Sequence, residues 1–378
     1  MKICIDIRSL TMPKTGVGYY TNNLINSILY LDQENEYNLF YYNFFNRKYE
    51  FDIDGNRVSS KEIKFIPQRV FNFVWRYIDF PKLDTIVGKM DLFHFPNFTM
   101  MPVKKGKVVI TVHDLSFMRY PHFTEPKNLK LLKRLFVKSI HRADLIFADS
   151  EFTKRDIIDV YHIDENKIQT VYLGVDNKFN ANITLSEIEK VKEKYFLPDK
   201  YIFYVGTLEP RKNIPALLNA YKLLKERNKG LPYKLVIVGM KGWLYDEIFQ
   251  DIQRLQLEND IIFTGYVEDN DLHLIYNGGS LLVYPSFYEG FGFPVIEAMA
   301  CGIPVVCSDK TSLPEVAGDA SIFCSTDDYE EISIKIEQVL SDKQLKKEMV
   351  NKGFQQARKF TWEKTAKTVL SSYKELVQ

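Results

Sequence analysis

Short apolar runs alternate with stretches of helical periodicity along most of the chain, and this alternation constrains the fold more than any other feature. Apolar runs of strand length occur at residues 2–7, 92–95, 108–112 and 145–148, and apolar residues recur at helical spacing over 24–31. Strands that alternate with helices form parallel sheets that helices cover on both faces. The first half of the sequence therefore predicts a doubly wound α/β domain.

The same alternation begins again after a polar stretch in the middle of the chain. The runs of strand length in this second series are 201–205, 235–238, 261–264, 281–284 and 304–307. The polar stretch ends in Leu197-Pro198-Asp199-Lys200, which is typical of a loop. We therefore expect two tandem Rossmann-like domains, 1–175 and 201–358, joined by a linker at 176–200 that contains a hinge.

Ligand sites can be placed on this fold before any motif is considered. Parallel α/β sheets bind ligands at the carboxyl ends of their strands. Two such edges that face each other form a deep cleft, in which each domain can hold one substrate.

Composition and charge exclude several classes of protein. The chain has 50 Lys and Arg against 49 Asp and Glu, and its net charge of +1 argues against a dedicated nucleic-acid-binding protein. Its four cysteines form no C-x-x-C pair and have no zinc-ligand spacing, which indicates reduced thiols in a cytoplasmic protein. Asp6 and Arg8 interrupt the first apolar run, and no run of about 18 apolar residues occurs, so we expect neither a signal peptide nor a membrane span.

Basic residues concentrate in one region of the first domain. Residues 101–142 contain ten Lys and Arg against two acidic residues, Asp114 and Glu125. Six of the ten flank an apolar helical stripe: Lys127, Lys130, Lys133, Arg134, Lys138 and Arg142. Two interpretations remain open: a solvated helix face packed on its own sheet, or a peripheral contact with anionic lipid or a lipid-diphosphate acceptor.

The segment Glu289–Glu297 is the most specific chemical signal. Two carboxylates stand eight residues apart across a predicted strand-to-helix turn, and Gly290 and Gly292 let the backbone pass close to a ligand. Pro294 suits the first turn of a helix, whose free N–H groups can bind hydroxyl or phosphate oxygens. The simpler interpretation is a routine glycine turn with two solvated glutamates.

Five segments in order now support a resemblance that covers nearly the whole chain. They are Thr15–Tyr19 (T-G-V-G-Y), Thr111–Leu115 (T-V-H-D-L), Ser150–Thr153 (S-E-F-T), Gly206–Asn213 (G-T-L-E-P-R-K-N) and Glu289–Glu297 (E-x7-E). Together they resemble the retaining glycosyltransferases of the GT-B fold, family 4 (group 1). The form of Gly206–Asn213 is similar to the mannosyltransferase-like branch, which makes bacterial surface polysaccharides.

The resemblance implies a division of labour between the domains. The first domain would bind the acceptor, and the second would bind a nucleotide-diphosphate sugar. A C-terminal helix at 359–378 would pack back on the first domain.

The resemblance also implies roles for individual residues of the second domain. Lys212 and Arg211 would meet the negative charge of the leaving diphosphate. Glu289 would contact hydroxyls of the transferred sugar, together with the backbone amides of Phe291 and Gly292. Glu297 would accept hydrogen bonds from the ribose, since two carboxylate oxygens suit a diol.

Three further positions complete the implied donor site. Gly206 and Thr207 belong to the phosphate loop, and backbone groups at Val267 would meet the nucleotide base. Many relatives carry Arg where this chain has Thr207. Lys212 is therefore the firmer assignment, and whether Arg211 turns inward to replace the missing charge stays open; two exposed basic residues are the simpler alternative.

In the first domain the resemblance assigns His113, Gly16 and Gly18. His113 would contact the donor sugar, although a lone histidine is more often structural. Gly16 and Gly18 would allow close approach of a phosphate or an acceptor hydroxyl. Because residue 21 is threonine, the third glycine of a dinucleotide fingerprint is missing, which disfavours a dehydrogenase.

The mechanism and the need for a metal are also expectations. Asp52-Ile53-Asp54 has the D-x-D pattern that binds metal in another glycosyltransferase fold, but its polar surroundings indicate a turn, so we expect neither a metal nor another cofactor.

His113 is not assigned as a base. Two proposals stay open for retention: front-side attack, in which the leaving phosphate takes the acceptor proton, and a covalent intermediate on Glu289.

The implied function is transfer of a hexose, best interpreted as mannose from GDP-mannose, to a glycan or lipid-linked acceptor in bacterial surface polysaccharide synthesis such as that of lipopolysaccharide. We expect a cytoplasmic enzyme that can contact the inner face of the membrane. The alternatives are a UDP- or dTDP-sugar-dependent transferase, and a non-catalytic nucleotide-sugar-binding or assembly protein of the same fold.

Overall fold

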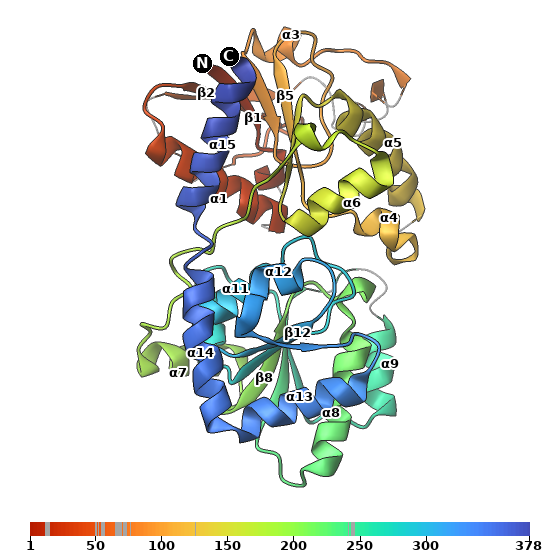
Figure 1. Cartoon of the computed structure of the whole chain (residues 1–378), viewed down its shortest axis with the longest axis vertical. Coiled ribbons are helices and arrows are strands. Elements are labelled where there is room, and N and C mark those ends of the chain that lie inside the picture. Colours follow the sequence, from red (N-terminus) through yellow and green to blue (C-terminus); the bar gives the residue numbers. More distant parts are fainter. Residues whose placement is uncertain are drawn as a thin grey trace. The chain divides into compact units, whose positions relative to one another are not determined.

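A computed structural model of the 378-residue chain describes residues 1–11, 16–49, 51, 53, 57–64, 70, 74–75, 77–124, 126–240, 242 and 246–378. The chain divides into two compact units. The first consists of Met1–Gly174 together with Thr361–Gln378, and the second is Val175–Phe360. Both chain termini lie in the first unit (Figure 1).

The first unit is built on a parallel sheet of seven strands in the order β3-β2-β1-β4-β5-β6-β7. The strands are β1 (Lys2–Asp6), β2 (Glu36–Tyr42), β3 (Val58–Ile63), β4 (Leu92–Phe95), β5 (Lys107–Val112), β6 (Leu145–Ala148) and β7 (Ile168–Thr170). The central strands β1, β4 and β5 are almost fully buried, as expected when helices cover both faces of a parallel sheet.

Helices and short 3-10 turns accompany the strands of the first unit. Those described are α1 (Gly16–Leu31), α3 (Asp84–Val87), α4 (Ser116–Arg119), α5 (Pro126–Arg142), α6 (Glu151–Tyr161) and α15 (Trp362–Val377), with the 3-10 turns η1 (Arg8–Thr11), η2 (Pro121–Phe123) and η3 (Glu165–Lys167). Ser150 caps α6, because its Oγ accepts a hydrogen bond from the Thr153 backbone N–H at 3.0 Å. The S-E-F-T segment is therefore a helix start in this structure.

The C-terminal helix α15 is part of the first unit. Its buried residues Ala366, Val369 and Tyr373 recur at helical spacing, and α15 packs against α1. The Tyr373 hydroxyl is hydrogen-bonded to Nδ1 of His94 at 2.5 Å, and Thr365 Oγ1 donates to the carbonyl of Tyr172 at 2.7 Å. These two polar contacts fix the helix to β4 and to the chain after β7.

The second unit has a parallel sheet of six strands in the order β10-β9-β8-β11-β12-β13. Its strands are β8 (Tyr201–Val205), β9 (Lys234–Val238), β10 (Ile261–Gly265), β11 (Leu281–Tyr284), β12 (Val305–Ser308) and β13 (Ile322–Cys324). Its described helices are α7 (Leu185–Tyr195), α8 (Ile214–Arg227), α9 (Asp246–Arg254), α10 (Leu272–Gly278), α11 (Phe293–Ala300), α12 (Leu313–Ala317), α13 (Tyr329–Ser341) and α14 (Lys343–Ala357), with the 3-10 turns η4 (Pro210–Lys212) and η5 (Gly318–Ala320).

The segment 176–200 differs from the linker predicted for it, because it folds as part of the second unit. Its helix α7 starts at a capping box of Thr184 and Glu187. Near the end of α7, Lys194 Nζ and the Tyr195 hydroxyl both donate to Oδ2 of Asp271, at 2.6 and 2.8 Å. Val191 is the residue of α7 that is fully buried, and the polar composition of the rest of the segment suggested a loop.

Candidate functional site

The loop after β8 carries the two cations predicted to meet the diphosphate. Arg211 and Lys212 lie in η4, directly before α8. Asn213 holds the end of this turn, because its Nδ2 donates to the carbonyls of Pro285 at 3.2 Å and Thr326 at 2.8 Å. The loop is therefore fastened to the chain that follows β11 and β13, at the carboxyl edge of the sheet.

Gly206 begins this loop in a conformation that requires glycine. Its φ is +150°, and an added Cβ would lie 2.5 Å from the Tyr204 hydroxyl. Its N–H donates to the carbonyl of Val238 on the neighbouring strand β9 at 2.9 Å. Thr207 follows it and leads the chain towards η4.

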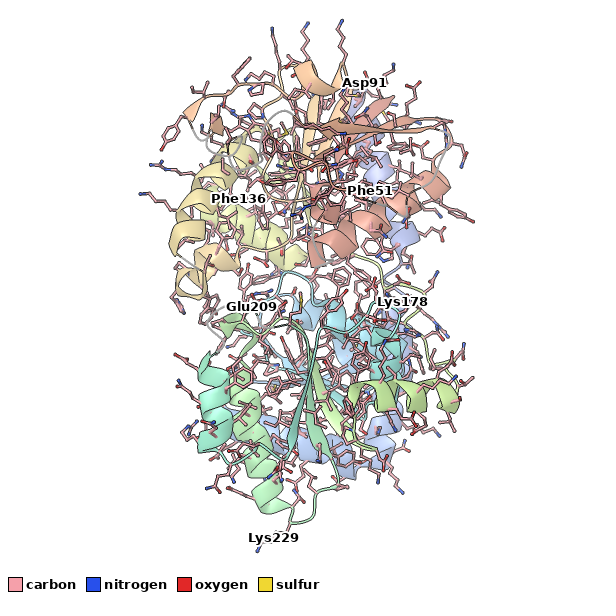
Figure 2. All side chains as sticks on the ribbon, turned by 180° about the vertical axis from the view of Figure 1, so that it is seen from behind. Phe51, Asp91, Phe136, Lys178, Glu209 and Lys229 are labelled. Atoms are coloured by element: carbon pink, nitrogen blue, oxygen red, sulfur yellow. The ribbon has the colours of Figure 1, made fainter. Side chains whose placement is uncertain are left out.

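Glu289 lies between the two cations. Lys212 Nζ donates to Glu289 Oε1 at 2.6 Å and to the Tyr284 hydroxyl at 2.7 Å. Arg211 Nη1 donates to Glu289 Oε2 at 3.0 Å, and Arg211 Nε pairs with Glu209 Oε1 at 2.6 Å. Arg211 therefore turns inward, which the sequence left open. Figure 2 shows Glu209 at this edge of the second unit's sheet.

Burial and pairing set the charge of this cluster. Burial alone would raise the pKa of Glu289, but the nearby charges of Lys212 and Arg211 outweigh burial and lower that pKa to about 2. The pKa of Lys212 is lowered by its burial and by Arg211, and Glu289 opposes that change. Glu289 is thus ionised at neutral pH, and its two oxygens are occupied by the cations.

The turn between β11 and α11 positions Glu289 and the start of the helix. Gly292 is the residue before α11, with a φ of +104°, and an added Cβ would lie 2.6 Å from Leu313 Cδ2. Ser312 Oγ contacts the carbonyls of Glu289 at 2.9 Å and Phe291 at 3.1 Å. The turn is therefore held by α12 and the residue before it.

Glu297 lies inside α11 and is buried apart from the cation cluster. The Tyr276 hydroxyl donates to Glu297 Oε2 at 2.7 Å. Burial raises the pKa of Glu297 to about 7, although the hydrogen bond from Tyr276 acts to lower it. Val267, the predicted base contact, follows β10 at the same edge of the sheet and is largely buried.

In the first unit, His113 follows β5 and both of its ring nitrogens face acceptors. Nδ1 lies 2.7 Å from Asp149 Oδ2, and Nε2 lies 3.1 Å from the carbonyl of Pro96. Burial acts to lower the pKa of His113, but the carboxylate of Asp149 raises it, and the net shift is upward. Because a carboxylate and a carbonyl can only accept, this geometry favours the doubly protonated ring, which acts as a donor and not as a base.

Gly16 and Gly18 lie at the start of α1 with different surroundings. Gly16 is exposed, and an added Cβ would meet nothing within 4 Å. Gly18 is buried, with the Ser9 carbonyl oxygen 3.3 Å from the position of a Cβ. Thr15 of the same motif lies outside the described residues, as do Asp52 and Asp54 of the predicted D-x-D turn.

Three side chains that contact the predicted site residues were not predicted from the sequence. Asp149 ends the strand next to that of His113, and its position directly before the S-E-F-T segment was the available signal. Glu209 lies inside the G-T-L-E-P-R-K-N segment, and its signal was a carboxylate close in sequence to two cations. Tyr284 gave no signal, because a tyrosine at the end of an apolar strand is indistinguishable from a core residue.

Comparison with known proteins decides the family. Residues 186–356 match the family description "Glycosyl transferases group 1", and residues 32–179 match "Glycosyltransferase Family 4". The O-antigen chain mannosyltransferase B of Escherichia coli is 32% identical over 385 residues, which cover 100% of both chains. The chain belongs to the group 1 glycosyltransferases. The family predicted from the five sequence segments is therefore confirmed for this glycosyltransferase.

Solved structures agree on the fold of this glycosyltransferase. Sucrose-phosphate synthase from Thermosynechococcus elongatus aligns with a TM-score of 0.79 at 18% identity, covering 99% of this chain and 98% of that one. The Anabaena protein HepE, in complex with UDP and glucose, aligns with a TM-score of 0.76 at 17% identity, covering 99% and 100%. The fold is therefore the GT-B fold with its two Rossmann-like units. No helix in the described part of the glycosyltransferase is long and apolar enough to cross a membrane.

Proposed function

We propose that this glycosyltransferase transfers mannose from GDP-mannose, with retention of configuration, to a glycan or lipid-linked acceptor of a bacterial surface polysaccharide. The observation that carries the proposal is the cluster of Arg211, Lys212 and Glu289. It joins two cations and one carboxylate at the carboxyl edge of the second unit's sheet. The choice of mannose is supported by the full-length similarity to the O-antigen chain mannosyltransferase B of Escherichia coli.

The cluster suits the departure of a nucleoside diphosphate. Negative charge develops on the diphosphate as the glycosidic bond breaks, and fixed cations in a site that excludes water stabilise that charge. Lys212 and Arg211 would exchange their bonds to Glu289 for bonds to phosphate oxygens. Glu289 would then accept hydrogen bonds from the sugar hydroxyls, and these two cations make a metal ion unnecessary in this proposal.

The remaining donor contacts follow the same edge of the second unit. Glu297 would accept the ribose hydroxyls, and the backbone at Val267 would meet the base. The amides of Phe291 and Gly292 would bind the sugar from the start of α11, and Gly206 and Thr207 would let the phosphates approach the loop after β8.

The contacts of Glu289 and His113 support front-side attack over a covalent intermediate. Both oxygens of Glu289 are bonded to cations before the donor binds, and in this proposal the sugar hydroxyls then occupy them. Both ring nitrogens of His113 face protein acceptors, Asp149 and the Pro96 carbonyl, so His113 would not remove a proton from the acceptor. The leaving phosphate is then the group that takes the acceptor proton.

A transfer assay tests the proposal. We would incubate the full chain with GDP-mannose or UDP-glucose and with methyl α-mannoside or a mannose disaccharide as acceptor, with and without EDTA. The expected product is an α-mannoside formed from GDP-mannose alone, with equal yield in EDTA, and proton NMR of the product reports its anomeric configuration. A β-linked product would contradict retention, and transfer only from UDP-glucose would contradict the donor.

We predict that donor affinity rises with pH because of Glu297. A carboxyl group with a pKa of about 7 is mostly protonated at pH 6 and mostly ionised at pH 8, and only the ionised form accepts both ribose hydroxyls. GDP-mannose has no phosphate that titrates in this range, so its KM should fall about tenfold between pH 6 and pH 8. The Glu297→Gln variant should have a flat profile; a wild-type profile in that variant would contradict the role of Glu297.

We further propose that the enzyme acts in the cytoplasm at the inner face of the membrane, where a lipid-linked acceptor would be found.

A further inference from the structure

Helix α5 carries an unbalanced basic face. The sequence from 126 to 142 contains no acidic residue, and Lys130, Arg134 and His141 are exposed, with the exposed Val137 between them. These four positions follow the spacing i, i+4, i+7 and i+11, so they form one stripe along the helix. The stripe has no carboxylate partner on its own helix.

The opposite face of α5 fixes the direction of this stripe. Phe136 and Ile140 are fully buried in the core of the first unit, together with residues of β5 and β6. Figure 2 labels Phe136 on this helix. Because the apolar face is anchored in the core, the basic stripe points away from it into solvent.

Large apolar side chains are exposed beside α5. Tyr77, Ile78 and Phe80 are 62%, 61% and 65% exposed, well above the usual exposure of such side chains. Their segment is tied to α5 by an ion pair between Arg142 and Asp79 and by a hydrogen bond from Lys138 Nζ to the carbonyl of Trp75 at 3.2 Å. The basic stripe and the apolar segment are therefore neighbouring parts of one surface, which we call the α5 surface.

We propose that the α5 surface docks the enzyme on a membrane leaflet that contains anionic lipids. Cations beside exposed aromatic and aliphatic side chains are the combination that binds a membrane interface: the cations attract the anionic headgroups, and the apolar side chains enter the boundary between headgroups and acyl chains. A nucleic acid or another soluble polyanion would engage only the cations and would leave three apolar side chains in water.

This inference deepens the proposed function, since it gives the enzyme a place beside a lipid-linked acceptor. It does not depend on the donor or on the chemistry at Glu289. Vesicle binding and transfer to a soluble acceptor therefore report on the two proposals separately.

The test is cosedimentation of the full chain with vesicles of phosphatidylethanolamine and phosphatidylglycerol, compared with phosphatidylcholine vesicles. Two variants divide the surface: Lys130→Glu with Arg134→Glu reverses two charges of the stripe, and Tyr77→Ser, Ile78→Ser and Phe80→Ser together remove the apolar part. The matched control is Lys343→Glu with Lys347→Glu, which reverses two exposed charges on α14 of the second unit.

We expect the wild type and the control to bind the anionic vesicles equally, and each α5-surface variant to bind at least tenfold more weakly. Binding that remains in the serine variant should vanish in 0.5 M salt, because only screened charges are left. All variants should transfer mannose to a soluble acceptor at the wild-type rate.

Three results would overturn the proposal. One is no preference of the wild type for anionic vesicles. Another is equal loss of binding in the α14 control, which would indicate a general charge effect. The third is wild-type binding by the serine variant together with charge-dependent binding to heparin, which would assign the stripe to a soluble polyanion.

Discussion

The Glu289→Gln variant should bind GDP about tenfold more tightly than the wild type and should transfer mannose at least a hundredfold more slowly. In the structure, Lys212 and Arg211 are both bonded to Glu289, at 2.6 and 3.0 Å. A diphosphate must compete with that carboxylate for the cations, so a neutral amide lowers the cost of binding. Transfer should nevertheless fail, because the charged acceptor for the sugar hydroxyls is gone.

The measurement is calorimetric titration with GDP, paired with a transfer assay. Loss of Glu289 removes the group that supports the charge of Lys212, whose pKa is already lowered by burial and by Arg211. The titration is therefore run at pH 6.5 as well as at pH 8, since a lower pH favours protonated Lys212. Glu226→Gln is the matched control, since that glutamate is exposed and pairs only with Lys222 at 3.5 Å among the described ion pairs. GDP binding weaker than in the wild type, by a folded variant, would contradict this account of the cluster.

The Lys212→Met variant should lose transfer by about a hundred- to a thousandfold, the effect of removing one fixed group that stabilises transition-state charge. Methionine keeps most of the volume of the buried side chain but cannot donate to a phosphate oxygen. GDP binding should weaken as well, in contrast to the Glu289→Gln variant. Glu289→Gln should thus tighten GDP binding and Lys212→Met should weaken it. These opposite effects are expected if the Glu289 carboxylate and the phosphate compete for the same cation.

Stability has to be separated from function in this variant. Removing Lys212 leaves Glu289 buried with Arg211 as its one cation among the described ion pairs, and breaking a buried pair is commonly destabilising by about 3–5 kcal/mol. Thermal unfolding of Lys212→Met and of the surface control Lys222→Met shows whether the protein is folded at the assay temperature. Rates near the wild-type value in folded Lys212→Met protein would exclude Lys212 from the chemistry.

The sequence was sufficient for the fold because parallel strands are buried on both faces. Runs such as 201–205 and 281–284 are continuously apolar, which distinguishes them from the helices that follow. It failed at 176–200, where α7 is held by its capping box and by bonds to Asp271. Local pattern does not reveal a helix whose stability comes from polar contacts with a distant segment.

The motifs name the candidate site residues but do not give their pairing in the structure. The motif identified Arg211, Lys212 and Glu289 but could not give the direction of Arg211, which depends on Glu209 and Glu289 in three dimensions. The same holds for His113: its position followed from the motif, whereas its charge follows from Asp149 on the adjacent strand. Glu289 is 78 residues from Arg211 and Asp149 is 36 residues from His113, and no spacing rule connects these pairs.

The most direct test of the central claim is calorimetric titration of the purified full chain with GDP, UDP and dTDP. We predict that GDP binds at least tenfold more tightly than the other two nucleotides and that Lys212→Met weakens this binding. Tighter binding of UDP or dTDP would contradict the GDP-mannose donor, and no binding of any nucleotide by folded protein would contradict a working donor site.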